Sequence, residues 1–461
     1  MHSLIAGRQS HDRWQNYIRV FALVLAALFL FAILLLFHGP AVTIQWNATC
    51  QTIDGFGASV SGYTKAFTPV EADRFFSPTS GLGLSLLRIR IIPSTIDEDC
   101  HCVANSEPAS CVVGEASQIL SGDIKIAEQA AAYGVTVIAA PWSPPAKMKS
   151  SGKYCTSGAF LGGTSNYNEY AATLASFPPL LKQNGVPLYA ISIQNEPDMA
   201  VAAYDTCTWT SKQVHDFVPF LSSALQAVGF EATKIAIPEE SSWKFDLMDA
   251  AVRDNSVLSQ VGLILGHGYT TGAPSRIPEM ANHHVWQTEV SNPDSYNAKI
   301  KDALRWAASI HDYMSAGASA WMFWNLDCGT SRYNQSNNMC LTGQDSELAK
   351  RGYVLGQFAK FIRPGWQRIG VSDSGSLLVT AYKGPDKKYA LVVINRRYIP
   401  AVYQKFELSG ALDWGARVTP WITSSSQSLV VQSPISLTPG RTAFHYTIPA
   451  RSVVTFYGQA S

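Results

Sequence analysis

Short apolar runs recur along residues 54–324, and stretches with helical spacing of apolar positions separate them. Such continuous runs are typical of buried parallel strands, because helices cover both faces of a parallel sheet. We expect eight strands, at Asp54–Ser59, Leu84–Ile91, Val135–Ala140, Leu188–Ile193, Lys234–Pro238, Leu263–Gly268, His284–Thr288 and Ala318–Trp324. The helices expected between them include Ile124–Tyr133, Asn168–Asn184, Ser211–Val228 and Ala298–Ser315. Eight alternating units predict an α/β fold closed into a (β/α)8 TIM barrel.

The N-terminal region has a different pattern. A basic tail (residues 1–17) precedes an apolar segment (residues 18–38), and Val20–Phe37 contains no charged residue. The length approaches the roughly 20 residues that a membrane-spanning helix needs, and the arginines before it favour a cytoplasmic N-terminus. A cleaved signal peptide is the alternative, but Phe37-His38-Gly39-Pro40 is a poor cleavage site. We therefore expect a membrane anchor, or secretion if the segment is cleaved, and both place the remainder outside the cytoplasm.

The pattern changes again after Pro364, where short strand-like runs alternate with turn residues. We expect strands at Leu377–Tyr382, Tyr389–Asn395, Val402–Leu408, Arg417–Ile422, Leu429–Val431, Thr442–Ile448 and Ser452–Tyr457. This pattern predicts a small antiparallel β domain. Its edge could accept Val42–Trp46, so both ends of the exported part (residues 41–53 and 366–461) would build the side domain around a barrel at residues 54–365.

Composition adds constraints on partners and compartment. A net charge of +1 with 15% charged residues gives no electrostatic case for nucleic acid, and we expect a monomer. Eight cysteines suit an oxidising compartment. We expect Cys328 to pair with Cys340, and Cys100, Cys102 and Cys111 to find partners among themselves. No Cys-x-x-Cys pair exists, and the adjacent His283 and His284 would point to opposite faces of a strand, so we expect no metal.

Two glutamates are the strongest candidates for chemistry. Glu196 follows the fourth expected strand and Glu289 follows the seventh, and 93 residues separate them. A barrel of about 250 residues uses roughly 31 residues per strand–helix unit, so this spacing corresponds to three units. Both carboxylates would then lie at the same barrel mouth, as glycoside hydrolysis requires. The amide of Asn195 would hydrogen-bond a sugar hydroxyl or the nucleophile. The alternative for Asn195-Glu196-Pro197 is a surface turn or helix start.

Several segments of the chain resemble glycoside hydrolase family 30, in the family's order. They are Ile53–Ser59, Leu87–Arg90, Ala140–Lys149, Gln194–Pro197, His267–Tyr269, Trp286–Glu289 and Lys350–Gly365. The resemblance implies a barrel fused to a side β domain, and retention of anomeric configuration without a metal or organic cofactor. It also implies Glu196 as acid/base and Glu289 as nucleophile.

The same resemblance implies roles for residues around the two glutamates. Arg88 looks like the arginine that keeps the nucleophile ionised, and Tyr269 like the tyrosine that hydrogen-bonds it. Trp142 and Trp324 look like aromatic walls beside the scissile bond, and His267 would contact the sugar or fill the barrel mouth. The alternatives are a structural ion pair for Arg88 and core packing for the aromatic residues.

The substrate is expected to be a polysaccharide, and the resemblance is greatest to the bacterial xylanase branch, which implies an endo-β-1,4-xylanase. Arg332 and Tyr333 could bind a glucuronate branch, although Asp327 in the same loop would repel it. The alternatives are a β-1,6-galactanase, a β-1,6-glucanase, a glucosylceramidase-like hydrolase, or a barrel that only binds carbohydrate.

Overall fold

The computed structural model describes Val24 and residues 41–460, except residues 94–99, 104–109, 114–115, 270–271, 276–282, 330–336, 373, 399–400 and 411–412. Apart from Val24, the expected membrane anchor lies outside these residues. Within the described part of the chain, no helix is long and apolar enough to cross a membrane.

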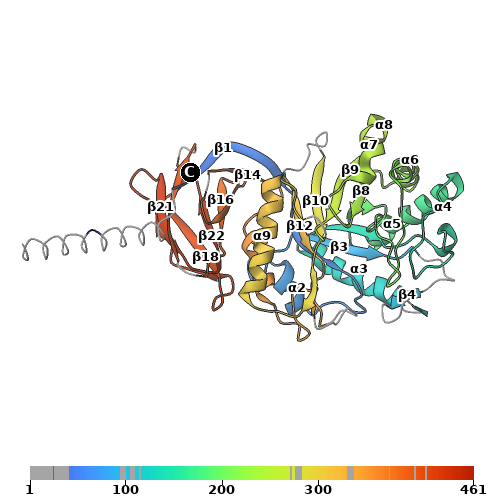
Figure 1. Cartoon of the computed structure of the whole chain (residues 1–461), viewed down its shortest axis with the longest axis horizontal. Coiled ribbons are helices and arrows are strands. Elements are labelled where there is room, and N and C mark those ends of the chain that lie inside the picture. The colour runs from blue at the N-terminus through green and yellow to red at the C-terminus, as the bar shows by residue number, and fades with distance from the viewer. Residues whose placement is uncertain are drawn as a thin grey trace, which may run out of the picture.

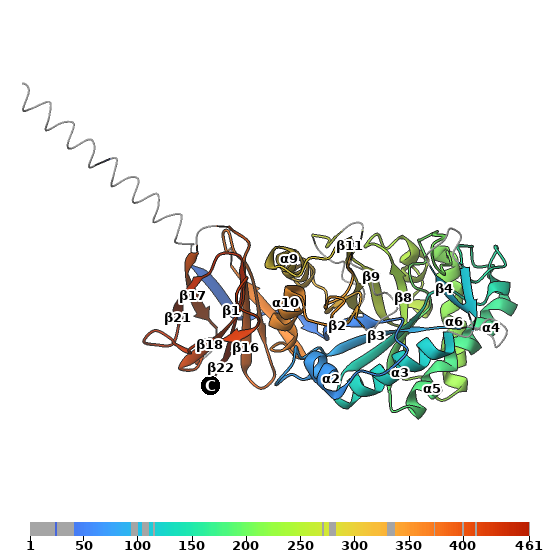
Figure 2. The same ribbon diagram turned by 90° about the horizontal axis from the view of Figure 1, so that it is seen from below.

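Eight parallel strands close into the expected barrel, which Figures 1 and 2 show as one of two lobes. In barrel order they are β2 (Gly55–Val60), β3 (Leu86–Ile91), β6 (Thr136–Pro141), β7 (Leu188–Ser192), β8 (Lys234–Glu240), β9 (Val261–His267), β10 (His284–Glu289) and β12 (Ala320–Phe323). Each overlaps one of the eight predicted apolar runs. Side chains buried on both sides of these strands explain why the runs are continuous.

Helices surround the barrel: α2 (Pro69–Phe76), α3 (Ala116–Ala132), α4 (Thr164–Ala175), α5 (Phe177–Gln183), α6 (Ser211–Ala227), α7 (Asp249–Val252), α8 (Asn255–Leu258), α9 (Ile300–Ala316) and α10 (Lys350–Ala359), with short 3-10 turns at Ala146–Met148 and Asp246–Met248. The single helix predicted at Asn168–Asn184 is wrong, because the chain breaks at Ser176 into α4 and α5. Pro178 and Pro179 lack the backbone N–H that a continuous helix needs, and Pro178 occupies the first turn of α5.

The side domain is one large, mainly antiparallel sheet. Its main path runs β19 (Val430–Val431), β18 (Arg417–Thr423), β22 (Ser452–Gln459), β16 (Lys388–Asn395), β15 (Leu378–Lys383), β14 (Trp366–Val371), β1 (Val42–Ile53), β17 (Val402–Ser409) and β21 (Ala443–Ile448), and β20 (Ile435–Ser436) pairs with β18. The expectation that the first strand adds to an edge is wrong. Strand β1 lies inside the sheet, antiparallel to β14 and parallel to β17. Val42 and Ile44 are fully buried in the core of the side domain, which an edge strand would leave partly open.

The two lobes share a packed boundary formed by α9 and α10. Figure 1 shows α9 between the side sheet and barrel strands β10 and β12. The side-chain amide of Gln357 on α10 donates to the hydroxyl of Thr423 on β18, and the backbone carbonyl of Gln357 accepts a hydrogen bond from the hydroxyl of Thr455 on β22. These buried contacts fix the side sheet against the barrel.

Among the side chains that the structure describes, two disulfides connect loops of the barrel. The predicted pair Cys328–Cys340 is present. Cys102 pairs with Cys155, so its expected pairing with Cys100 or Cys111 is wrong. The hairpin of β4 (Cys100–Val103) and β5 (Ser110–Val113) carries Cys102 to the loop after β6, where both cysteines are buried. Cys50 and Cys207 are free thiols.

Candidate active site

Glu196 lies just beyond β7 and Glu289 ends β10, at the same mouth of the barrel. The backbone of Glu196 is left-handed, with φ of 45°, a conformation that costs a non-glycine residue about 1–3 kcal/mol. Hydrogen bonds hold it there: its N–H donates to the carbonyl of Glu239 at 3.0 Å, and the N–H of Asn195 donates to the carbonyl of Pro141 at 2.8 Å. Glu196 is 6% exposed, so the segment is neither a surface turn nor a helix start.

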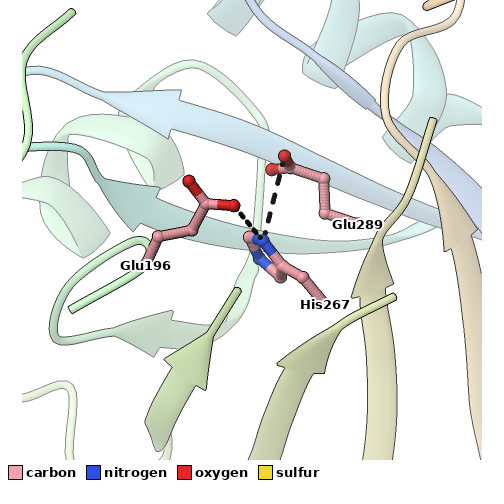
Figure 3. Close-up of side chains that lie close together, drawn as sticks. All are labelled: Glu196, His267 and Glu289. Carbon is pink, nitrogen blue, oxygen red and sulfur yellow. Dashed lines mark hydrogen bonds and ion pairs between the residues drawn. The ribbon is translucent and has the colours of Figure 1, made fainter. Parts of the chain in front are cut away.

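The two carboxylates face one another across His267, as Figure 3 shows. Nδ1 of His267 lies 3.1 Å from Oε1 of Glu196 and 3.8 Å from Oε1 of Glu289. The carboxylate oxygens and the imidazole nitrogen lie within 4.8 Å of one another. Carboxyl groups about 5 Å apart suit a retaining glycosidase, since an inverting enzyme needs about 6.5–9.5 Å to admit a water molecule.

Arg88 on β3 is fully buried and contacts three side chains of the site. Its Nη1 lies 2.8 Å from Oε2 of Glu289, and its Nη2 donates to Oδ1 of Asn195 at 2.6 Å. Arg88, Glu289 and Asn195, all predicted site residues, are thus in contact through the guanidinium of Arg88. Burial raises the pKa of Glu289, and the positive charges of His267 and Arg88 act in the opposite direction.

The third partner of Arg88 is Glu239 on β8, which the sequence analysis missed. Nε of Arg88 donates to Oε1 of Glu239 at 2.8 Å, and the hydroxyl of Thr288 donates to the same oxygen at 3.1 Å. Burial opposes ionisation, yet Arg88 and then His267 lower the pKa of Glu239 to about 2. Glu239 is the first residue after the predicted strand Lys234–Pro238, so the criterion that selected Glu196 and Glu289 also applies to it.

His267 at the end of β9 is fully buried between the carboxylates. Burial disfavours its charged form, but the charge of Glu289 and the hydrogen bond to Glu196 raise the pKa of His267 to about 10. The ring is therefore an imidazolium at neutral pH. His267 contacts both glutamates directly, so it does more than fill space in the barrel mouth.

Two tyrosines contact the two glutamates separately. The hydroxyl of Tyr269, which was predicted, donates to Oε1 of Glu289 at 2.8 Å. The hydroxyl of Tyr204, which was not, donates to Oε2 of Glu196 at 2.9 Å. Burial raises the pKa of both hydroxyls, so they remain hydrogen-bond donors at all working pH values. Tyr204 lies in the loop between β7 and α6, and no strand-end pattern points to it.

Trp142 and Trp324 form one wall of the mouth. Their ring centroids lie 5.6 Å apart with the planes tilted by 47°, and Tyr204 and Met339 pack against the pair. The guanidinium of Arg88 lies 4.6 Å from the ring centroid of Trp142. The two tryptophans, which the family resemblance implied and which follow β6 and β12, therefore meet beside the carboxylates.

Arg332 and Tyr333 lie outside the described residues. Asp327, in the same loop, is 1% exposed. Its carboxylate accepts hydrogen bonds from Thr342, Ser346 and the N–H of Gly329. These hydrogen bonds give Asp327 a structural role, because its carboxylate holds the loop together from inside. Its expected effect on a bound uronate stays a prediction.

Glu196, His267 and Glu289 also form the one group among the described residues whose donor atoms are close enough to hold a metal ion. The site contains its own positive charges: His267 contacts both glutamates, and Arg88 contacts Glu289. His283 and His284 have separate partners, the carbonyl of Val261 and the carboxylate of Asp54.

A closed (β/α)8 barrel with two facing carboxylates at its mouth defines a retaining glycoside hydrolase. Residues 365–456 match the model of the glycosyl hydrolase family 30 beta sandwich domain. The chain is 30% identical over 351 residues to a glucuronoxylanase XynC of Bacillus subtilis, covering 72% of this chain and 76% of that protein, and the chain belongs to glycoside hydrolase family 30.

Two further similarities extend over nearly the whole chain. A glucuronoxylanase XynC of Bacillus subtilis strain 168 is 29% identical over 437 residues, covering 90% of this chain and 91% of that protein. The crystal structure of the family 30 subfamily 8 xylanase Xyn30A from Clostridium acetobutylicum superimposes with a TM-score of 0.75 at 30% identity, covering 91% of this chain and all of that one.

Proposed function

We propose that this glycosidase is an endo-β-1,4-xylanase in which Glu289 is the nucleophile and Glu196 the acid/base. The observation that carries the roles is the asymmetry of their partners. Glu289 receives the guanidinium of Arg88 and the hydroxyl of Tyr269, both of which stabilise an ionised carboxylate. Glu196 has no guanidinium on its carboxylate among the hydrogen bonds and ion pairs of the described residues, and is held by Tyr204 and His267.

In the first step, Glu196 gives its proton to the leaving glycosidic oxygen while Glu289 attacks the anomeric carbon. The bond to the leaving sugar breaks and a covalent glycosyl–Glu289 ester forms. Arg88 and Tyr269 orient the attacking carboxylate. Trp142 and Trp324 provide an apolar wall for the sugar ring and exclude water from the reacting atoms.

In the second step, Glu196 is a carboxylate and takes a proton from water. The resulting hydroxide attacks the anomeric carbon and releases Glu289, so two inversions give net retention. His267 lies beside Glu196 in both steps, with its Nδ1 3.1 Å from Oε1 of that carboxyl group.

Xylan as substrate is supported by the similarity to glucuronoxylanases and to a xylanase structure. Recognition of a glucuronate branch by Arg332 and Tyr333 belongs to the same proposal.

We further propose export of the barrel from the cytoplasm, with residues 18–38 as the membrane anchor. The disulfides Cys102–Cys155 and Cys328–Cys340 support an oxidising compartment.

The test is product analysis with a pair of matched variants. The protein is incubated with glucuronoxylan, unbranched β-1,4-xylan, β-1,6-galactan, β-1,6-glucan and glucosylceramide. We expect oligosaccharides from the two xylans, and Glu289→Gln should lower the rate by at least about 10⁴-fold. Glu196→Ala should recover activity with azide on a substrate with a good leaving group and give a β-glycosyl azide. Cleavage of only the galactan, glucan or glycolipid would contradict the substrate assignment.

A further inference from the structure

A second concave site lies at the junction of the barrel and the side sheet. It is a cavity of about 440 Å³, walled on the barrel side by β11 (Asn292–Ser295), β13 (Asn337–Asn338) and the first turns of α9. Arg396 and Tyr398, after β16, and Arg451, before β22, form the opposite wall. Neither glutamate of the active site lines this cavity, and neither do Trp142 and Trp324.

Positive charge dominates the cavity. The four cationic side chains that line it are Lys301, Arg305, Arg396 and Arg451. Of the acidic residues, Asp302 is buried and neutralised by Arg351 at 3.0 Å, and Asp294 lies 3.9 Å from Arg305. Asp312 lies near Arg396. The lining thus contains two acidic side chains, Asp294 and Asp302, against four cationic ones, and the excess charge favours an anion.

An aromatic ring stands beside these cations. Tyr398 is 65% exposed, and the guanidinium of Arg451 lies 4.8 Å from its ring centroid. The N–H of Arg451 donates to the carbonyl of Arg397, which ties together the two loops that carry the wall. An exposed tyrosine offers a stacking face for a sugar ring, and a guanidinium next to it matches a carboxylate in planar geometry.

We propose that this cavity is a second glycan-binding site, separate from the active site, for uronate-bearing segments of an acidic polysaccharide. The assignment of a glycan to this cavity rests on the proposed function. The assignment of an acidic glycan rests on the positive charge of the cavity. When one segment of a polysaccharide binds in this cavity, the neighbouring segments of the same polymer stay at high local concentration near the active site. A small phosphate ion would use the cations but would not need Tyr398.

The test uses the full chain carrying Glu289→Gln, so that the polymer is not degraded. Retention is measured by native affinity electrophoresis in gels with glucuronoxylan, polygalacturonate or unbranched neutral xylan. Adding Arg396→Gln and Arg451→Gln should weaken retention by both acidic polymers by roughly three- to tenfold, the range for loss of two exposed ion pairs, and 0.5 M NaCl (about a 4 Å screening length) should do the same. Retention by neutral xylan should not change. Arg417→Gln, an exposed arginine elsewhere in the side sheet, is the matched control.

Equal retention of the double variant and the control would overturn the site. Tyr398→Ala should also weaken retention by the acidic polymers, and an unchanged result would overturn the assignment to a glycan. The pair Arg396→Lys and Arg451→Lys keeps both charges and should retain most of the binding. If this pair loses binding as fully as the Gln pair, charge does not hold the polymer and the proposal is overturned. If the active enzyme cleaves no xylan while retention by acidic polymers persists, the proposed function fails and this site stands.

Discussion

Nδ1 of His267 lies 3.1 Å from Oε1 of Glu196, and the same ring is protonated at neutral pH because anionic groups surround it. A permanent positive charge therefore lies between the two carboxylates. Its loss should be visible in the pH dependence of the reaction.

The variant His267→Gln removes that charge and keeps a hydrogen-bonding side chain. Because the imidazolium opposes the effect of burial on Glu289, its removal should raise the pKa of Glu289 further. A nucleophile with a raised pKa is protonated at higher pH, so the acid limb of the kcat/KM profile should move toward neutral pH. His445→Gln, on the exposed side of the side domain, is the control, and an unmoved acid limb in His267→Gln would contradict the prediction.

The variant Glu239→Gln tests whether the ionised carboxylate of Glu239 contributes to the free energy of unfolding. A group whose pKa is lowered from 4.5 to about 2 by folding stabilises the protein above pH 4.5, and this contribution is lost as the pH falls through 2. The variant should therefore be less stable than the parent by about 3 kcal/mol near neutral pH, and the difference should shrink between pH 4.5 and 2. Chemical denaturation across this pH range measures it.

Thr288→Val is the control for Glu239→Gln. It removes a hydrogen bond to the same carboxylate oxygen without removing the charge, and should cost about 1 kcal/mol with little pH dependence in that range. A difference between Glu239→Gln and the parent that does not vary with pH would refute the ionic role of Glu239.

Tyr204→Phe and Tyr269→Phe separate the two proposed catalytic roles. Tyr204 contacts the acid/base and Tyr269 the nucleophile. A nitrophenyl leaving group needs no proton, so the first step on an aryl xyloside should be slowed by Tyr269→Phe and much less by Tyr204→Phe. On xylan, both variants should be roughly 10- to 100-fold slower than the parent enzyme if each hydroxyl contributes about 1.5–3 kcal/mol through a hydrogen bond to a charged group. Identical leaving-group dependence would argue against the assignment of roles.

The disulfide Cys102–Cys155 closes a long loop, with a sequence separation of 53. Replacing both cysteines with serine should lower the free energy of unfolding by about 4 kcal/mol if the loop-entropy account holds. Differential scanning calorimetry measures the change, and Cys50→Ser, at an exposed free thiol, should leave the melting temperature unchanged.

The sequence is sufficient to predict the barrel, because burial on both faces makes each strand a continuous apolar run. The same pattern points to Glu196 and Glu289, since each follows such a run, whereas Arg88 lies inside an expected strand and was identified through the family resemblance. Glu239 meets the same criterion and was overlooked. Tyr204 could not be found in this way, because its contact with Glu196 depends on the path of a loop.

The sequence-based predictions that proved wrong concern features that depend on contacts between distant parts of the chain. The position of β1 inside the side sheet depends on pairing with β17, more than 300 residues away, which local hydrophobic alternation does not encode. The partner of Cys102 depends on where the β4–β5 hairpin carries it. The burial of Asp327 and its three hydrogen bonds likewise depend on the path of its loop, which its neighbours in sequence do not encode.

The interior position of β1 has a mechanical consequence. A force that pulls residue 41 along the axis of β1 would load the hydrogen bonds to β14 and β17 in shear, so that these bonds share the force. An edge strand pulled sideways would separate one bond at a time. Because β1 ends at Ile53 and β2 begins at Gly55, this clamp lies between the point of force and the first barrel strand. The side sheet thus absorbs tension before it reaches the strands that position Arg88 and the two glutamates.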